Sequence, residues 1–186
     1  MTDAPTNIDQ SSPQQRRRHY GWWLVFALVV LLFAVCLPTV IRYQRQNTLI
    51  EGIEKSGGWV KTIPDGPQWQ RNLLGRERMR SLDSVVGIMV ADPQINNDWI
   101  GNIADFNNLE RLSLSDTQVT DAGLAQLKGL TRLEELYLEN TLISDAGLVH
   151  LEGLTKLEWL SLVSTRVNNA GLEHLTGLSK LRGLFL

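Results

Sequence analysis

Few side chains in this sequence have the types and spacing needed for catalysis or metal binding. His150 and His174 stand 24 residues apart, but Gln126 and Asn102 hold the equivalent earlier positions. Two imidazoles are fewer than the three or four ligands of a typical metal centre. The sequence also shows no glycine-rich phosphate loop, no nucleophile elbow and no metal-spaced set of Cys and His. We therefore expect a protein that is not an enzyme, with no catalytic residues, no metal and no cofactor.

A second group of side chains is suited to recognition. Aromatic, arginine and acidic residues recur at the third, fifth and seventh positions of the segments LERLSLS, LEELYLE and LEWLSLV. If the leucines of such a strand are buried, these positions point outward. Trp, Tyr and Arg dominate binding hot spots, although aromatic residues also favour strands in general. The candidate partner-binding residues are Arg111, Glu135, Tyr137, Glu139, Trp159, Ser161 and Phe185.

The elements that position these side chains come from an internal repeat. Leu109, Leu133, Leu157 and Leu181 recur at steps of 24 residues, and residues 85–108 fit the same register as a degenerate first copy. Each copy alternates apolar and polar residues as a half-buried strand does, then continues into a short helical pattern. One copy buries too little apolar surface to fold alone, so the copies must stack into a solenoid. Leu112, Leu136 and Leu160 should then lie in register on adjacent parallel strands.

Other repeated positions predict the turns between these elements. Thr117, Thr141 and Thr165 should bond backbone groups where each strand ends, and Asn96, Thr120, Ser144 and Asn168 should cap the short helices. Asp121 and Asp145 suit the first helical turn. Gly129, Gly153 and Gly177 should let the chain turn towards the next copy.

The pattern L-x-x-L-x-L-x-x-T-x-[VI]-[TS]-D-A-G-L-x-x-L resembles that of leucine-rich-repeat proteins, especially bacterial members. The resemblance covers residues 85–186. It implies an α/β solenoid with parallel strands on the concave side and short helices on the convex side. It also implies a protein or peptide ligand on the concave strand face.

The apolar run Trp22–Ile41 carries no charge and is long enough for a transmembrane helix, because roughly 20 residues cross a bilayer core of about 30 Å. A cleaved signal peptide is the alternative, but its apolar region would be shorter, and Ala34-Val35-Cys36 is a poor processing site. Three arginines precede the run and two follow it, which favours a cytoplasmic N-terminus. The repeats would then lie on the exoplasmic or periplasmic side. With this orientation, the single cysteine favours a bacterial envelope protein, because it leaves no disulfide-rich caps.

The predicted organisation has four parts. These are a disordered tail over 1–19, a transmembrane helix over 20–41, a juxtamembrane helix and N-terminal cap over 42–84, and the leucine-rich-repeat domain over 85–186. Within the cap we expect a helix ended by Gly57-Gly58, a strand over 59–63 and a short helix over 68–74. Four arginines of this part, at 71, 76, 78 and 80, are placed either to meet an anionic membrane or to form a solvated face.

The charge distribution narrows the class of partner. Residues 85–186 hold 7 Lys+Arg against 13 Asp+Glu, which argues against nucleic acid. The leading hypothesis is a membrane-anchored binding module. One alternative is a scaffolding protein of the cell envelope that self-associates through Leu184–Leu186, and another is an intracellular adaptor with the opposite orientation.

Overall fold

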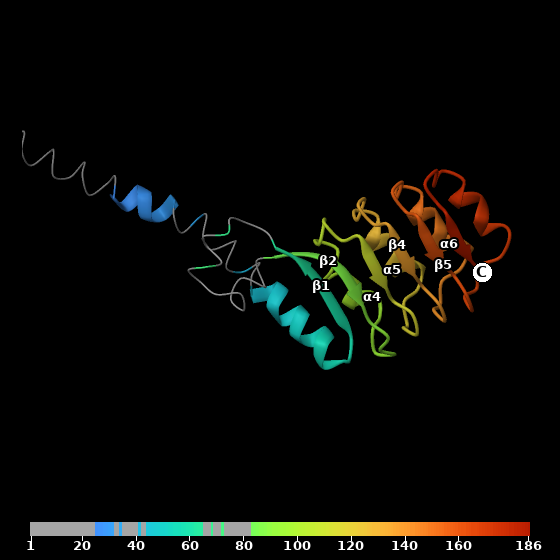
Figure 1. The fold of residues 1–186 in the computed structure, drawn as a ribbon, viewed down its shortest axis with the longest axis horizontal. Helices are drawn as coiled ribbons and strands as arrows, with labels where there is room; N and C mark the ends of the chain where they lie inside the picture. The colour runs from blue at the N-terminus through green and yellow to red at the C-terminus, as the bar shows by residue number, and fades with distance from the viewer. Residues whose placement is uncertain are drawn as a thin grey trace, which may run out of the picture. The chain divides into compact units, whose positions relative to one another are not determined.

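The computed structural model describes residues 25–31, 34, 41, 44–64, 68, 72 and 83–186. The chain divides into two compact units, Met1–Gln44 and Arg45–Leu186. The second unit holds the repeats, and Figure 1 shows its strands and helices in the order of the sequence.

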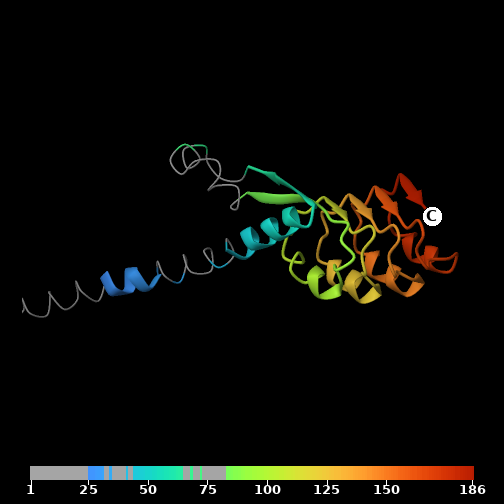
Figure 2. The same cartoon turned by 90° about the horizontal axis from the view of Figure 1, so that it is seen from below.

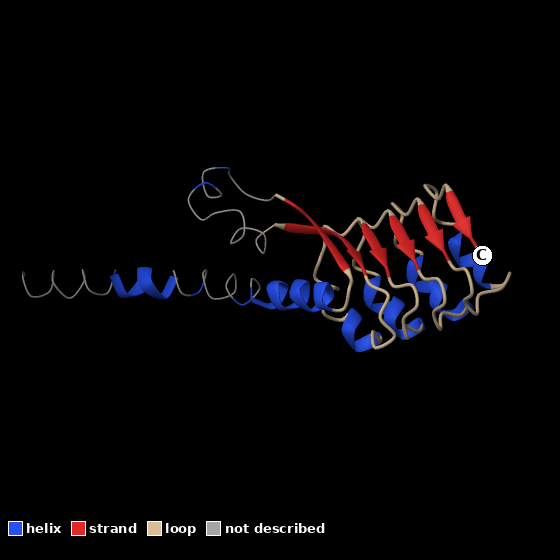
Figure 3. Ribbon diagram, turned by 60° about the horizontal axis from the view of Figure 1, so that its bottom comes forward, coloured by secondary structure: helices blue, strands red, loops and turns tan. Residues whose placement is uncertain are grey.

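One sheet of six strands runs through the second unit in chain order. β2 to β6 are parallel, and β1 pairs antiparallel with β2. The strands follow one side of the unit and the helices the other (Figures 2 and 3). The strands are β1 (Trp59–Ile63), β2 (Ser84–Met89), β3 (Arg111–Ser113), β4 (Glu135–Tyr137), β5 (Trp159–Ser161) and β6 (Gly183–Phe185). The helices of the repeats are α4 (Asn97–Ile100), α5 (Asp121–Leu127) and α6 (Asp145–Leu148), with the 3₁₀ helices η2 (Val149–Leu151) and η3 (Gly171–Leu175).

The leucines of successive copies stack as the repeat predicts. Leu112 pairs in register with Leu136, and Leu136 with Leu160. All three side chains are fully buried, and each contributes roughly 2 kcal/mol of transfer free energy. The degenerate first copy joins the same stack, because Ile88 pairs with Leu112. The predicted solenoid register is therefore confirmed.

A ladder of polar side chains joins each coil to the next on the helix side. Asn97 accepts a hydrogen bond from the backbone N–H of Thr120 at 3.0 Å, and Asp121 accepts one from Ser144 at 2.8 Å. Asp145 does the same for Asn168 at 2.8 Å. Asp121 and Asp145 lie in the first turns of α5 and α6, as predicted. Their hydrogen bonds to the next coil were not predicted. The ladder therefore satisfies the N–H group with which the next helix begins.

The same ladder explains the glycine that the three full copies share at positions 123, 147 and 171. A Cβ at Gly123, Gly147 or Gly171 would overlap the side chain of Asn97, Asp121 or Asp145, respectively. Glycine lets the preceding coil bring its carboxylate or amide close enough to bond. Thr120 and Ser144 hold the predicted N-cap positions but make no capping bond with their side chains. Their hydroxyls bond Asn97 and Asp121 of the preceding coil instead.

The turn after each strand uses two special positions. Thr117 and Thr141 donate to the carbonyls of Leu114 and Leu138 at 2.6 and 2.7 Å, which confirms their predicted role. The residue before each threonine has a left-handed backbone: φ is 59° at Asp116, 51° at Asn140 and 57° at Ser164. Asp and Asn tolerate this conformation better than other side chains do.

The prediction for Gly129, Gly153 and Gly177 was wrong. None of the three has a positive φ, and a Cβ at each would meet open space. These turns therefore need no glycine.

The N-terminal cap closes one end of the core. Residues 44–55 are helical, and the helix ends at Gly57, whose φ is 78°. Gly58 N–H then bonds the carbonyl of Ile53 at 2.9 Å, a hydrogen bond that ends the helix as predicted. Ile50, Ile53 and Val60 belong to the same buried cluster as the repeat leucines. The predicted helix over 68–74 and the four arginines lie outside the described residues, apart from 68 and 72.

The described part of the first unit includes a helical stretch over 25–31. Its apolar side chains are exposed, among them Phe26 and Leu31 at 61% each. No helix among the described residues is both long and apolar enough to cross a bilayer. The rest of the predicted span, residues 22–24, 32–33 and 35–40, lies outside the described residues.

Replacement with alanine should change stability in opposite directions at Gly153, which faces open space, and at Gly147, which contacts Asp121. Gly153→Ala should raise the free energy of unfolding by about 0.4–1 kcal/mol, because it restricts only the unfolded chain. Gly147→Ala should lower it by about 1–3 kcal/mol, because the methyl group displaces the Asp121 carboxylate from Ser144. Urea unfolding of the unit 45–186, followed by circular dichroism, measures both. Equal effects of the two substitutions would contradict the ladder.

Candidate binding face

The outward side chains of the sheet form one continuous surface, which we call the strand face. Register places Gly87, Arg111, Glu135, Trp159 and Gly183 in one row across the strands. Met89, Ser113, Tyr137, Ser161 and Phe185 form the next row. Ser115, Glu139 and Val163 follow the strands at the positions two residues further on. The predicted binding residues therefore all lie along this face.

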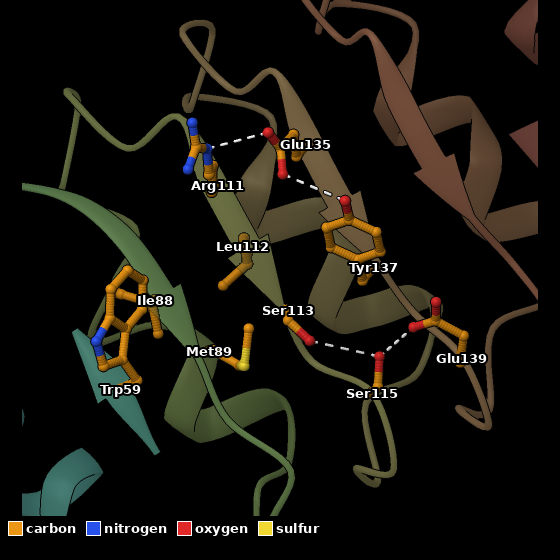
Figure 4. Close-up of a pocket in the computed structure, with 10 residues that line it drawn as sticks. All are labelled: Trp59, Ile88, Met89, Arg111, Leu112, Ser113, Ser115, Glu135, Tyr137 and Glu139. Carbon is orange, nitrogen blue, oxygen red and sulfur yellow. Dashed lines mark hydrogen bonds and ion pairs between the residues drawn. The ribbon is translucent and has the colours of Figure 1, made fainter. Parts of the chain in front are cut away.

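The strand face contains a hollow of about 480 Å³ over β2 to β4. Figure 4 shows apolar side chains of β1 and β2 on one side, and on the other the polar side chains of β3, β4 and the residues that follow these strands, with Leu112 between the two groups. The lining residues are Trp59, Ile88, Met89, Arg111, Leu112, Ser113, Ser115, Glu135, Tyr137 and Glu139.

Arg111, Glu135 and Tyr137 form one polar cluster at the edge of this hollow. Arg111 Nε lies 3.0 Å from Glu135 Oε1, and Tyr137 Oη donates to Glu135 Oε2 at 3.2 Å. Partial burial, and then the charge of Glu135, raise the pKa of Tyr137 above its ordinary value. Tyr137 is therefore a neutral phenol that can donate a hydrogen bond, and Glu135 is already paired with a cation.

Glu139 has a different environment. The hydroxyl of Ser115 donates to Glu139 Oε2, and the hydroxyl of Ser161 and the backbone N–H of Glu139 also donate to its carboxylate. Partial burial raises the pKa of Glu139, but these hydrogen bonds outweigh it and leave the pKa below its ordinary value. Glu139 therefore presents a fixed, ionised carboxylate to the hollow.

Trp159 and Phe185 extend the face beyond the hollow. Their rings stack with centroids 6.3 Å apart and an interplanar angle of 16°. Trp159 is 39% exposed and Phe185 is 48% exposed. A Cβ at Gly183 would overlap the Trp159 indole, so this glycine allows the ring to lie flat on the sheet.

Only some of the predicted binding residues lie at the hollow. Arg111, Glu135, Tyr137 and Glu139 line the hollow, while Trp159 and Phe185 lie on the next two strands. Ser161 is only 2% exposed, so it supports Glu139 and offers little surface to a partner.

Sequence reasoning missed Trp59 and Met89, which are 51% and 54% exposed on this face. Met89 could have been found, because it holds the same repeat position as Ser113 and Tyr137. Trp59 comes from the antiparallel strand and carries no repeat signal. A Cβ at Gly87 would only touch the Trp59 ring at 3.5 Å, so this ring does not need a glycine below it as Trp159 needs Gly183.

The two histidines take no part in this face. His174 Nδ1 lies 2.9 Å from Glu152 Oε1 on the helix side. Among the residues that the structure describes, no three His, Cys, Asp or Glu side chains gather closely enough to hold a metal ion.

Comparison with known proteins agrees with this architecture. Residues 107–150 match the family model described as leucine rich repeats (2 copies). With the parallel register above, this shows a leucine-rich-repeat type of α/β solenoid. Comparison with curated proteins returns no match.

Two similar solved structures are internalins of Listeria monocytogenes. An internalin C2 is 31% identical over 53% of this chain and 41% of its own, with a TM-score of 0.45. An internalin named inlF is 18% identical over 54% of this chain and 34% of its own, with a TM-score of 0.41. The chain thus spans less than half the length of either.

The hydrogen bonds to Glu139 predict a measurable change in its titration. Replacing both Ser115 and Ser161 with Ala should raise the pKa of Glu139, because two donors to the ionised form are lost. Since the folded pKa is lowered, Glu139 stabilises the fold above its unfolded pKa of about 4.3, and that stability is lost as pH falls through the folded value. The double variant should therefore lose less stability on acidification.

Carboxyl ¹³C NMR titration of Glu139, with urea unfolding at neutral and acidic pH, measures both effects. Ser179→Ala, at an exposed serine away from Glu139, is the control. An unchanged Glu139 titration in the double variant would contradict the assignment.

Proposed function

We propose that this protein is a membrane-tethered binding module that recognises a protein or peptide on its strand face. The observation that carries the proposal is the exposure of large aromatic side chains on a sheet whose leucines are already buried. Trp59, Trp159 and Phe185 are 51%, 39% and 48% exposed on that face. They fill no core position, and Trp, Tyr and Arg are the residues on which protein interfaces most depend.

The chemistry of the face suits a polypeptide better than a nucleic acid. The hollow combines apolar walls from Trp59 and Met89 with the hydrogen-bonding groups of Tyr137 and Glu139. A polypeptide offers apolar side chains, amide groups and charges of both signs to such a surface. Phosphate groups would meet ionised Glu139 and a repeat region with a net charge of −6 (7 basic and 13 acidic residues).

Membrane attachment is the second part of the proposal. It rests on the uncharged run Trp22–Ile41 and on the helical stretch 25–31, which exposes apolar side chains all along its length. A helix that is apolar on every side is suited to lipid. The arginine bias across the run favours a cytoplasmic N-terminus, with the strand face on the exoplasmic or periplasmic side.

Self-association is the competing function. Leu184, Phe185 and Leu186 are 37%, 48% and 64% exposed, a small apolar surface that a second copy would cover. A molecular mass of the unit 45–186 that rises with concentration would favour this alternative.

Partner binding should depend on the aromatic side chains of the strand face. Tyr137→Ala and Trp159→Ala should each reduce capture of the partner by about tenfold or more, as expected for hot-spot aromatics. The measurement is quantitative crosslinking of the full chain in its own membrane. Val149→Ala, at a 41% exposed apolar side chain of η2 on the helix side, is the matched control. If Tyr137→Ala and Trp159→Ala capture the partner as well as the control does, the strand face is not the binding surface.

Attachment and orientation have a separate test. Leu28→Arg with Leu31→Arg should release the full chain from the membrane fraction, because each charge costs about 2.5–3.5 kcal/mol at the centre of a membrane helix. A cysteine placed at exposed Ser179, with Cys36→Ser, should react with a membrane-impermeant maleimide in intact cells. Reaction only after lysis would show the opposite orientation.

A further inference from the structure

We infer that the strand face recognises a basic residue of its partner. The carboxylate of Glu139 binds a lysine or arginine side chain at the centre of an extended segment of that partner. This inference rests on the proposed function and specifies the ligand of the same site.

The first step is the difference between the two carboxylates of the face. Glu135 is paired with Arg111 at 3.0 Å. Glu139 accepts hydrogen bonds from Ser115 and Ser161 but has no cationic partner among the described residues. Asp116 nearby adds further negative charge. Among the described residues of the face, Glu139 is therefore a carboxylate without a cationic partner, and a cation supplied by the partner would complement it.

The second step is the preorganisation of this carboxylate. Ser161 is 2% exposed and donates to Glu139 from the following coil, while Ser115 donates from the preceding coil. Side-chain ordering is a large part of the cost of binding, and here it is already met in the free protein. Ammonium and guanidinium groups form their strongest hydrogen bonds with ionised carboxylates.

The third step is the position of Glu139 between two apolar regions (Figure 4 shows the first of them). Met89 and Trp59 are exposed on β2 and β1, and Phe185 stacks with Trp159 on β6 and β5. Glu139 follows β4, midway between β2 and β6. Four strand spacings of about 4.8 Å separate β2 from β6, roughly 19 Å. About six extended residues span that distance, so the segment should carry a basic centre and an apolar side chain towards each end.

Other occupants fit the same face less well. A second strand face would bring its own Glu139, with the same uncompensated charge. An anionic lipid surface or nucleic acid would also be repelled by this carboxylate. A basic, apolar-flanked peptide is the occupant that matches both the charge and the spacing.

The test uses capped heptapeptide libraries and the full chain in detergent. One library has lysine or arginine at the centre, a matched library has glutamine there, and both vary the two ends. The wild type should enrich basic-centred peptides with leucine or aromatic ends. Glu139→Gln, which removes the charge but keeps the size of the side chain and one acceptor oxygen, should weaken the selected peptides by about tenfold or more. Glu173→Gln on η3 is the matched control and should change nothing.

A charge reversal provides a gain-of-function test. Glu139→Lys should favour peptides with glutamate at the centre over those with lysine. Equal binding of basic-centred and glutamine-centred peptides, unchanged binding by Glu139→Gln, or no peptide binding by the wild type would each overturn the inference. If Tyr137→Ala still abolishes partner capture in those cases, the strand face remains the binding surface and only the basic ligand is rejected. If Tyr137→Ala and Trp159→Ala both leave capture intact, the proposed function itself fails.

Discussion

The stacking of leucines in register on adjacent parallel strands is the constraint from which the other features of this protein follow. Leu112, Leu136 and Leu160 are fully buried one above the other, so their strands can present only the alternate positions to solvent. Side chains at those positions do not belong to the leucine core. Trp159, Tyr137 and Glu139 can therefore be chosen for recognition at little cost to the core.

Apolar stacking alone would not fix the position of each coil relative to the next. The ladder of polar side chains on the helix side does so, and each of its hydrogen bonds acts as a joint between two coils. Asn97, Asp121 and Asp145 each bond an N–H group of the following coil. A misplaced coil would leave that N–H group and its carboxylate or amide unpaired, which costs about 1–3 kcal/mol for each group when buried. The joints thus align the strands, and the aligned strands bring Ser115 and Ser161 to the same carboxylate of Glu139.

The sequence predicted much of what recurs with the 24-residue period. It gave the strands, the leucine core, the role of Thr117 and the outward positions, because each depends on a pattern within one copy. It missed what depends on contacts between copies: the forward bond of Asp121, the glycine that makes room for it, and the burial of Ser161. Trp59 was missed because its strand lies outside the period. Gly129 was misjudged because a glycine after a helix is usual but was not needed here.

The direction of the polar joints also bears on how such a protein can evolve. In each joint, one coil provides the accepting side chain and the next coil provides the N–H group. An inner coil therefore takes part in two such hydrogen bonds, one with each neighbouring coil. If a whole 24-residue unit is duplicated or lost, every accepting side chain still meets an N–H group of the next coil. An insertion of another length breaks the two hydrogen bonds that join the altered coil to its neighbours. Each duplication between β2 and β6 would also separate Met89 from Phe185 by a further strand spacing of about 4.8 Å. Gene duplication can therefore lengthen the strand face in fixed steps without altering the joints.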